Sequence, residues 1–211
     1  MRRIVLITLL LPSLLFAQTR SGPRAGLSLA TISSGQLLQW NGLPQLGPIL
    51  GYSFEVKWTE QAAFLIEPMY ISKGSFVRNA QFDQNTSTRY GYLELPVILK
   101  LSLGKDPGGI FLSGGIMGGY WLTGRQVSKV SGITQYNTQY DLSQANRRFQ
   151  YGVALGLGVD KGNFSFEARV QTSLSPFKAV YQAQNLVIGL HFTYYIPKKA
   201  DRDKKKEKEL E

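Results

Sequence analysis

The stretch YGYLELPVILKLSL, residues 90–103, decides the fold. Apolar side chains occupy every second position of it, namely Leu93, Leu95, Val97, Leu99, Leu101 and Leu103. The positions between them hold Glu94, Pro96, Ile98, Lys100 and Ser102. A two-residue period predicts a β-strand with one apolar face and one mixed face. A wall that separates lipid from a narrow polar interior selects this pattern.

The same alternation recurs along the chain and predicts eight strands, at residues 22–32, 47–58, 62–74, 90–103, 110–122, 148–160, 164–172 and 184–196. Their lengths, roughly 10 to 14 residues, suit strands that cross a bilayer at a tilt. Long loops are expected at residues 33–46, 75–89, 123–147 and 173–183, and the other connections are short. Outer-membrane barrels place long loops outside and short turns in the periplasm. We therefore predict an all-β, eight-stranded, antiparallel up-and-down transmembrane barrel with both termini in the periplasm.

A soluble sandwich or a lipocalin-like barrel is the structural rival, because alternation alone does not tell whether the apolar face meets lipid or a core. Strand length, the asymmetry of the loops, a predicted export signal and aromatic residues at the strand ends favour the membrane. These aromatic residues are candidates for girdles at the bilayer interface: Trp58, Phe64, Tyr70, Tyr120, Tyr151, Phe164 and Tyr194. We therefore expect the protein in the outer membrane.

The composition divides the chain into three parts. Residues 1–17 are a predicted secretory signal peptide, with Arg2 and Arg3 before an apolar run and Ala17 at the expected cleavage site. A membrane anchor is the alternative, but the apolar run is short for a spanning helix. Residues 18–197 form the predicted barrel domain. Residues 198–211 form a tail of mixed charge, expected to be a solvated periplasmic extension or to dock to peptidoglycan, anionic lipid or a periplasmic partner.

The composition argues against several kinds of site. The formal net charge is +10, and the chain contains no Cys and one His. Disulfides and thiolate metal sites are thus excluded, and a single His does not favour a transition-metal centre. The basic residues form no clustered motif for nucleic acid, and no phosphate-binding loop stands at a strand–helix junction. We predict no cofactor, no metal and no nucleic-acid partner.

Short segments of the chain resemble the PorT-like family of outer-membrane β-barrels, also known as "porin family" or "outer membrane β-barrel domain" proteins. These segments are AGLSL at 25–29, LIEPMY at 65–70 with KG at 73–74, YLELP at 92–96, GLG at 156–158 and FEAR at 166–169. The resemblance spans residues 22–196 and implies an eight-stranded barrel in the outer membrane of Gram-negative bacteria. Because the namesake takes part in type IX protein secretion, it also implies a secretion-associated role. The charged tail after Pro197 departs from the usual family pattern.

If the apolar faces meet lipid, the opposite faces point into the barrel with eight charged residues: Glu55, Lys57, Glu67, Lys73, Glu94, Lys100, Glu167 and Arg169. An eight-stranded barrel is just wide enough for side chains to fill. Unpaired charges there would be costly, so we expect a salt-bridged plug. Glu94 and Lys100 are expected to lie at different heights and to meet different partners. The alternative for this network is a narrow path for ions or protons.

Two prolines and the single histidine need separate treatment. Pro68 and Pro96 each remove a hydrogen-bond donor in a barrel without edge strands, so we expect a bulge or missing hydrogen bonds there. His191 and Thr193 share one strand face, as His and Ser do in some outer-membrane acyl hydrolases. Catalysis would also need a nucleophile beside His191 and an orienting acid, and this face should point away from lipid. We do not expect an enzyme.

The function expected from the sequence is that of a structural, scaffolding or secretion-associated barrel, monomeric and surrounded by outer-membrane lipid. A periplasmic protein or a component of a secretion machinery is a possible partner. A small porin-like diffusion channel is the alternative, although the narrow interior is unfavourable for it. A lipid-modifying enzyme of the outer membrane is a more remote alternative.

Overall fold

The computed structural model describes residues 19–34, 41–104, 109–139, 148–175 and 183–197. The predicted signal peptide at residues 1–17 and the charged tail at 198–211 lie outside these residues. Nearly all of the described chain is β-strand: β1 Thr19–Ser34, β2 Asn41–Lys57, β3 Ala62–Ile66, β4 Met69–Asn79, β5 Gln84–Ser102, β6 Ile110–Val130, β7 Ile133–Gln139, β8 Phe149–Lys161, β9 Phe164–Ser173 and β10 Ala183–Tyr194. A short 3₁₀ helix, η1 Ala80–Phe82, lies between β4 and β5. No helix among the described residues is long and apolar enough to span a membrane.

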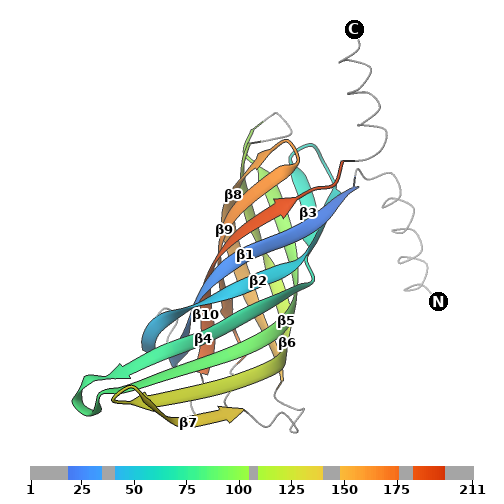
Figure 1. The fold of residues 1–211 in the computed structure, drawn as a ribbon. Helices are drawn as coiled ribbons and strands as arrows, with labels where there is room; N and C mark the ends of the chain where they lie inside the picture. Colours follow the sequence, from blue (N-terminus) through green and yellow to red (C-terminus); the bar gives the residue numbers. More distant parts are fainter. Residues whose placement is uncertain (1–18, 35–40, 105–108, 140–147, 176–182, 198–211) are drawn as a thin grey trace, which may run out of the picture.

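The strands form a closed antiparallel ring (Figure 1). Strand β1 pairs with β2 on one side and with β10 on the other, which joins the two ends of the sheet. Strands β3 and β4 follow each other along one path between β2 and β5. The series β5, β6, β8, β9 and β10 completes the ring. The predicted eight-stranded up-and-down barrel is therefore confirmed.

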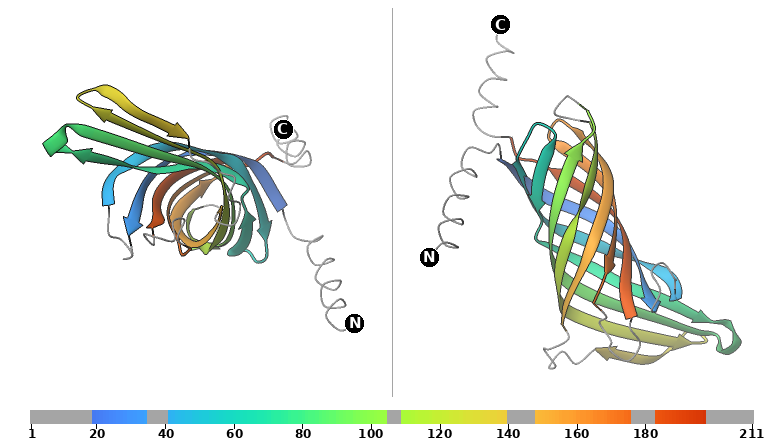
Figure 2. Two further views of the ribbon diagram at one scale, coloured as in Figure 1. Left: turned by 90° about the horizontal axis from the view of Figure 1, so that it is seen from below. Right: turned by 180° about the vertical axis from the view of Figure 1, so that it is seen from behind.

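The two ends of the barrel differ. Strand β1 begins and β10 ends at one end, which we call the terminal end and which also carries the turns β2–β3 and β8–β9 (Figure 1). The other end, which we call the hairpin end, carries two hairpins that project sideways beyond the outline of the barrel (Figure 2). One hairpin joins β4 to β5, and the other joins β6 to β7.

The alternation of side chains assigns the two faces of the wall as the sequence predicts. In β5, Leu93, Leu95 and Leu101 are about half exposed on the outer surface. Glu94 and Lys100, on the opposite face, are buried in the interior at 1% and 2% exposure. A β-strand in a closed wall offers only these two directions, so one residue of offset decides between them.

Aromatic residues form rows on the outer surface toward both ends of the barrel. At the terminal end, Trp58 stacks on Phe64 with ring centroids 5.7 Å apart, and Phe164 lies 5.3 Å from Tyr194. Toward the hairpin end, Tyr70 and Tyr120 flank Leu93 on the neighbouring strands. Such rows are typical of the two bilayer interfaces of a membrane barrel.

Pro68 and Pro96 lie next to each other in the wall, and the structure treats them differently. The path between β2 and β5 is interrupted at Glu67 and Pro68, which separates β3 from β4. Strand β5 continues through Pro96, opposite Met117 of β6, without a register shift there. The carbonyl oxygens of both prolines still accept hydrogen bonds, from Tyr52 N at 3.0 Å and from Glu67 N at 3.1 Å. The hydrogen bonds lost at the two prolines are therefore only those that a backbone N–H would donate.

Three segments predicted as loops contain extensive β-structure, so this part of the prediction is wrong. In the first, residues 33–34 belong to β1 and residues 41–46 to β2. Residues 75–79 and 84–89 extend β4 and β5 into a long hairpin. Within 123–147, β6 continues to Val130 and turns back as β7. Ser131 and Gly132 make this turn with φ values of 48° and 79°, which is the two-residue geometry that hairpins favour. Polar side chains here do not exclude strands, because most side chains of the hairpins are exposed or half-buried and do not pack in an apolar core.

The lipid-facing assignment predicts a position-dependent cost for a charge on the outer wall. Val97→Lys places an ammonium near the middle of the apolar surface and should lower the free energy of unfolding by about 2–4 kcal/mol. Ser87→Lys, on the same strand and face but in the hairpin, should change it little. Urea unfolding from phospholipid vesicles, followed by tryptophan fluorescence, measures both. Equal effects of the two substitutions would argue against lipid around Val97.

Candidate functional site: the barrel interior

The interior at the terminal end holds a cluster of four charged side chains, which we call the terminal cluster. Glu55 accepts hydrogen bonds from Arg20 Nε at 2.7 Å and Nη2 at 2.8 Å, and from Lys100 Nζ at 3.1 Å. Asp160 accepts from Lys100 Nζ at 2.6 Å and also pairs with Arg20. Tyr195 Oη donates to Glu55 Oε2 at 3.0 Å. Burial and the Glu55 carboxylate raise the pKa of Tyr195, so its hydroxyl stays protonated as a donor.

A second cluster, the middle cluster, consists of two guanidinium groups and two carboxylates, all buried. Arg24 donates to Glu67 at 2.8 Å and to Glu167 at 2.5 Å. Arg169 donates to Glu67 at 2.7 Å and to both oxygens of Glu167, at 2.9 and 2.7 Å. Each guanidinium therefore bridges the same two carboxylates. Planar guanidinium groups suit such paired contacts, which are among the stronger hydrogen bonds in proteins.

The third cluster, the outer cluster, lies toward the hairpin end and contains one ion pair, between Lys73 and Glu94. Gln150 and Gln171 donate to the two oxygens of Glu94, at 3.1 and 2.9 Å. Asn185 in turn donates to Gln150 Oε1 at 3.1 Å. Neutral amides therefore complete the shell around the buried carboxylate, so its charge is both paired and hydrogen-bonded.

Apolar residues fill the interior next to the outer cluster. One buried cluster joins side chains from five strands of the ring: Ala30, Ile49, Met69, Ile71, Tyr90, Tyr92 and Val187. Lys73 Nζ lies 4.9 Å from the centre of the Tyr92 ring, which links the apolar and ionic parts. The expected salt-bridged plug is therefore only part of the interior. Ile71, which belongs to this apolar part, falls on the inward face of the strand predicted at residues 62–74.

The positive and negative charges balance within each cluster. The terminal cluster has two cations and two carboxylates, the middle cluster has two of each, and the outer cluster has one of each. A buried unpaired ion costs several kcal/mol, so local neutrality is what makes such an interior tolerable. The arrangement leaves no net charge to attract an ion of either sign along the axis.

The structure brings together most of the eight residues predicted for the interior. Glu55, Glu67, Lys73, Glu94, Lys100, Glu167 and Arg169 are all buried and belong to the three clusters. Lys57 does not: it is half-buried at the terminal rim, and no described carboxylate forms an ion pair with it. Glu55 and Lys100 belong to the terminal cluster, and Glu67, Glu167 and Arg169 belong to the middle cluster.

Three charged members of the clusters were absent from the sequence-based set: Arg20, Arg24 and Asp160. Arg20 and Arg24 lie an even number of residues from Ser28, which faces the interior in β1. The alternation of side chains along the strand was therefore the available signal that both arginines face inward. Asp160 has the inward parity of Gln150 in β8 but lies at the strand end, where its composition suggested a turn. The alternation of inward and outward side chains therefore continues to the ends of β1 and β8.

His191 and Thr193 lie inside the barrel, on the inner face of β10. Arg24 Nε donates to His191 Nδ1 at 3.1 Å, and Arg24 Nη1 donates to Thr193 Oγ1 at 3.1 Å. The histidine accepts at Nδ1 and is only 4% exposed. Both side chains therefore act as acceptors that complete the hydrogen bonding of Arg24, on the side of the wall away from lipid.

The outer cluster offers a clean test of the cost of an unpaired interior charge. Lys73→Met leaves Glu94 buried without its cation and should lower the free energy of unfolding by about 3–5 kcal/mol. Lys73→Met combined with Glu94→Gln removes both charges and should recover most of that loss. Lys57→Met, at the half-buried rim, serves as the control and should have little effect. Urea unfolding in vesicles measures all three, and a double variant as unstable as Lys73→Met would contradict the pairing.

Residues 16–179 match the family model described as "Outer membrane protein beta-barrel domain". Among solved structures, the chain is similar to Ail, the attachment invasion locus protein of Yersinia pestis, with 12% identity, a TM-score of 0.49, and coverage of 85% of this chain and 99% of that one. It is also similar to Neisserial surface protein A, with 11% identity, a TM-score of 0.48, and coverage of 82% of this chain and 96% of that one. For OprG of Pseudomonas aeruginosa the identity is 12%, the TM-score is 0.43, and the coverage is 85% of this chain and 95% of that one. None of the curated proteins is a significant match. The family model covers well over half of the chain, and the protein therefore belongs to the outer membrane protein beta-barrel domain family and resides in the outer membrane.

Proposed function

We propose that the protein is a sealed outer-membrane barrel with a structural or scaffolding role, that it is associated with secretion, as the resemblance to the PorT-like family implies, and that it conducts no solutes. In this proposal the signal at residues 1–17 directs export in a Gram-negative cell. The terminal end faces the periplasm, and the hairpin end faces outward. The barrel acts as a monomer in lipid, without catalytic activity and without a nucleic-acid partner.

The observation that carries the proposal is the filled interior. Three charge-balanced clusters and one apolar cluster follow one another along the lumen, and their members come from facing walls. A passing ion would have to separate buried pairs such as Glu67 and Arg169, at a cost of several kcal/mol for each ion exposed. The lumen of an eight-stranded barrel leaves no second route around them.

The hairpin end supports an interaction role better than a transport role. Strand β7 pairs with β6, and all seven of its residues are exposed, including Ile133 and Tyr136 at 71% and 67%. Exposed strands of this kind can pair with an extended segment of another protein. The secretion-associated role itself is supported by the resemblance of segments such as YLELP at 92–96 to the PorT-like family.

Conductance separates a sealed barrel from a small diffusion channel. We expect no stable single-channel currents from the purified protein in planar bilayers. A variant with Arg24, Glu67, Glu167 and Arg169 all changed to Ala keeps the interior neutral but removes the middle cluster, and should show small currents because water replaces the side chains. Stable currents from the unmodified protein would refute the sealed barrel.

The secretion-associated role predicts a cellular phenotype that depends on the hairpins. Deletion of the gene should reduce export of proteins to the cell surface, and the complete protein should restore it. A version with residues 78–85 replaced by a two-residue Asn-Gly turn keeps the barrel and the middle cluster, and should fail to restore export. Surface proteomics, with heat-modifiable gel mobility as the check on folding, measures this. Unchanged export after deletion would argue against the role while leaving the sealed barrel intact.

A further inference from the structure

The outer face of the two hairpins carries an unusual set of charges. Residues 72–91 and 121–139 contain a single acid, Asp83, which lies at the tip of the β4–β5 hairpin. The same segments contain five basic residues, of which Lys73 points into the interior. The other four are all exposed: Arg78, Arg89, Arg125 and Lys129. We call these four residues the hairpin cations.

The strand register places the hairpin cations on one face of the sheet. Arg89 of β5 is directly opposite Arg125 of β6. Asn85 stands between Arg78 on one side and Lys129 on the other. Direct cross-strand neighbours have Cβ atoms roughly 5 Å apart, and four residues along a strand span roughly 13 Å. The cations therefore share a patch of about 10 by 13 Å.

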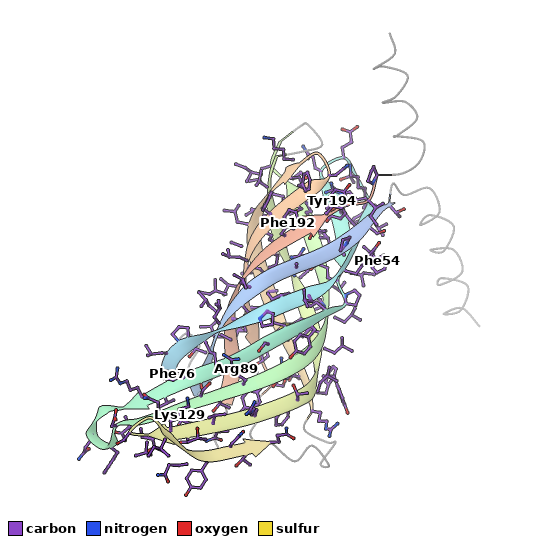
Figure 3. All side chains as sticks on the ribbon, in the orientation of Figure 1. Phe54, Phe76, Arg89, Lys129, Phe192 and Tyr194 are labelled. Carbon is purple, nitrogen blue, oxygen red and sulfur yellow. The ribbon has the colours of Figure 1, made fainter. Side chains whose placement is uncertain are left out.

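This face is continuous with the lipid-facing surface of the barrel. In β5, Arg89 has the same parity as the outward leucines, beginning with Leu93. In β6 the register shift opposite Gly91 and Tyr92 brings Arg125 onto the same face. Figure 3 labels Arg89 and Lys129 on this part of the sheet, together with Phe76, which lies on the same face of β4.

The height of the patch coincides with the expected position of lipid headgroups. Tyr70 and Tyr120 flank Leu93 in one row, which marks the bilayer interface as tyrosine girdles do. Arg89 lies four residues beyond Leu93, roughly 10 Å higher once the tilt of the strands is included. The polar interfacial layer begins at this height. The hairpins also project sideways beyond the barrel (Figure 2).

The patch retains its positive charge within the described structure. No described carboxylate forms an ion pair with any of the four hairpin cations, whereas each interior cation is paired. Arg125 Nε donates to the neutral amide of Asn137 at 2.9 Å. With the amide of Gln45 turned so that its oxygen faces Arg89, Arg89 Nε donates to it at 2.5 Å. These contacts orient the two guanidinium groups but do not neutralise them.

Two arginines directly opposite each other on neighbouring strands repel, which is unfavourable unless an anion lies between them. A phosphate accepts hydrogen bonds from guanidinium groups in a paired geometry and relieves this repulsion. We propose that the hairpin cations form a binding site for the phosphate headgroups of anionic lipid in the leaflet at the hairpin end. Phe76 and Val127, in the row between the cations, provide apolar contact for the upper acyl chain.

Native mass spectrometry of the protein in non-ionic detergent, titrated with phosphatidylglycerol or phosphatidylcholine, tests the site. The first phosphatidylglycerol should bind at least tenfold more tightly than phosphatidylcholine. Arg89→Gln combined with Arg125→Gln should weaken the binding of phosphatidylglycerol by about fivefold for each charge removed, or about 25-fold together. Arg78→Gln with Lys129→Gln should have a similar effect. Arg89→Lys with Arg125→Lys should retain most of the binding.

The matched control is Lys57→Gln with Lys161→Gln, which removes two charges at the terminal end and should leave the affinity within twofold. Heat-modifiable gel mobility confirms that each variant is folded, and either Gln pair alone suffices for the test. Equal affinity for the two lipids, or an equal loss in the control, overturns the site. Glycerol 3-phosphate should not displace the lipid at millimolar concentration, and equal competition by it would identify a site for soluble phosphate instead.

Discussion

Neutralisation of buried charge is the constraint on which the structure depends. The backbone ladder joins each strand to its two neighbours only, whereas the middle cluster joins strands across the lumen. Arg24 comes from β1, Glu67 from the junction of β3 and β4, and Glu167 from β9. Each of these groups would be costly to bury alone, and together they leave no unpaired charge. The ring therefore has a specific cross-section as well as a specific register, because these side chains reach their partners across the lumen.

An irregular part of the wall lies beside this cluster. The strand path is interrupted at Glu67 and Pro68, and Pro96 stands next to it on β5. Because the two prolines lack a backbone N–H, the ladder between these adjacent strands has fewer hydrogen bonds at that height. The side chain of Glu67 accepts hydrogen bonds from Arg24, Arg169 and Ser53 at the same place. Ion pairs across the lumen thus support the wall where the two prolines remove ladder donors, while Glu67 N still donates to Pro96 O.

The sequence predicts the barrel well because alternation with period two leaves a strand residue only two directions. Glu94 and Lys100 could therefore be assigned to the interior, but alternation says nothing about which strand lies opposite, so partners such as Lys73 and Asp160 required the three-dimensional ring.

The prediction of strands and interior residues failed where local composition and the alternation of side chains pointed to different answers. Arg20 lies before the predicted start of the first strand at residue 22, whereas β1 begins at Thr19. Arg24 lies within that strand, on the inward face that it shares with Ser28. Strand β7 was missed because its residues are polar, although Ser131 and Gly132 between two β-prone segments are a hairpin signal.

Parity and height together explain why identical side chains have different environments in this protein. Arg169 points inward, where two carboxylates are available and water is not, so its charge is neutralised by the protein itself. Arg89 points outward from a strand that also supplies the lipid-facing leucines, and the row of Tyr70 and Tyr120 separates it from them. A cation one row lower would lie in hydrocarbon and would be strongly unfavourable. A cation is tolerated at the height of the hairpin. There an anion from outside the chain supplies the counter-charge that the interior carboxylates supply to Arg169. Charge on this barrel is therefore distributed by the same rule on both faces: it is either paired within the wall or placed at the height where the surroundings can pair it.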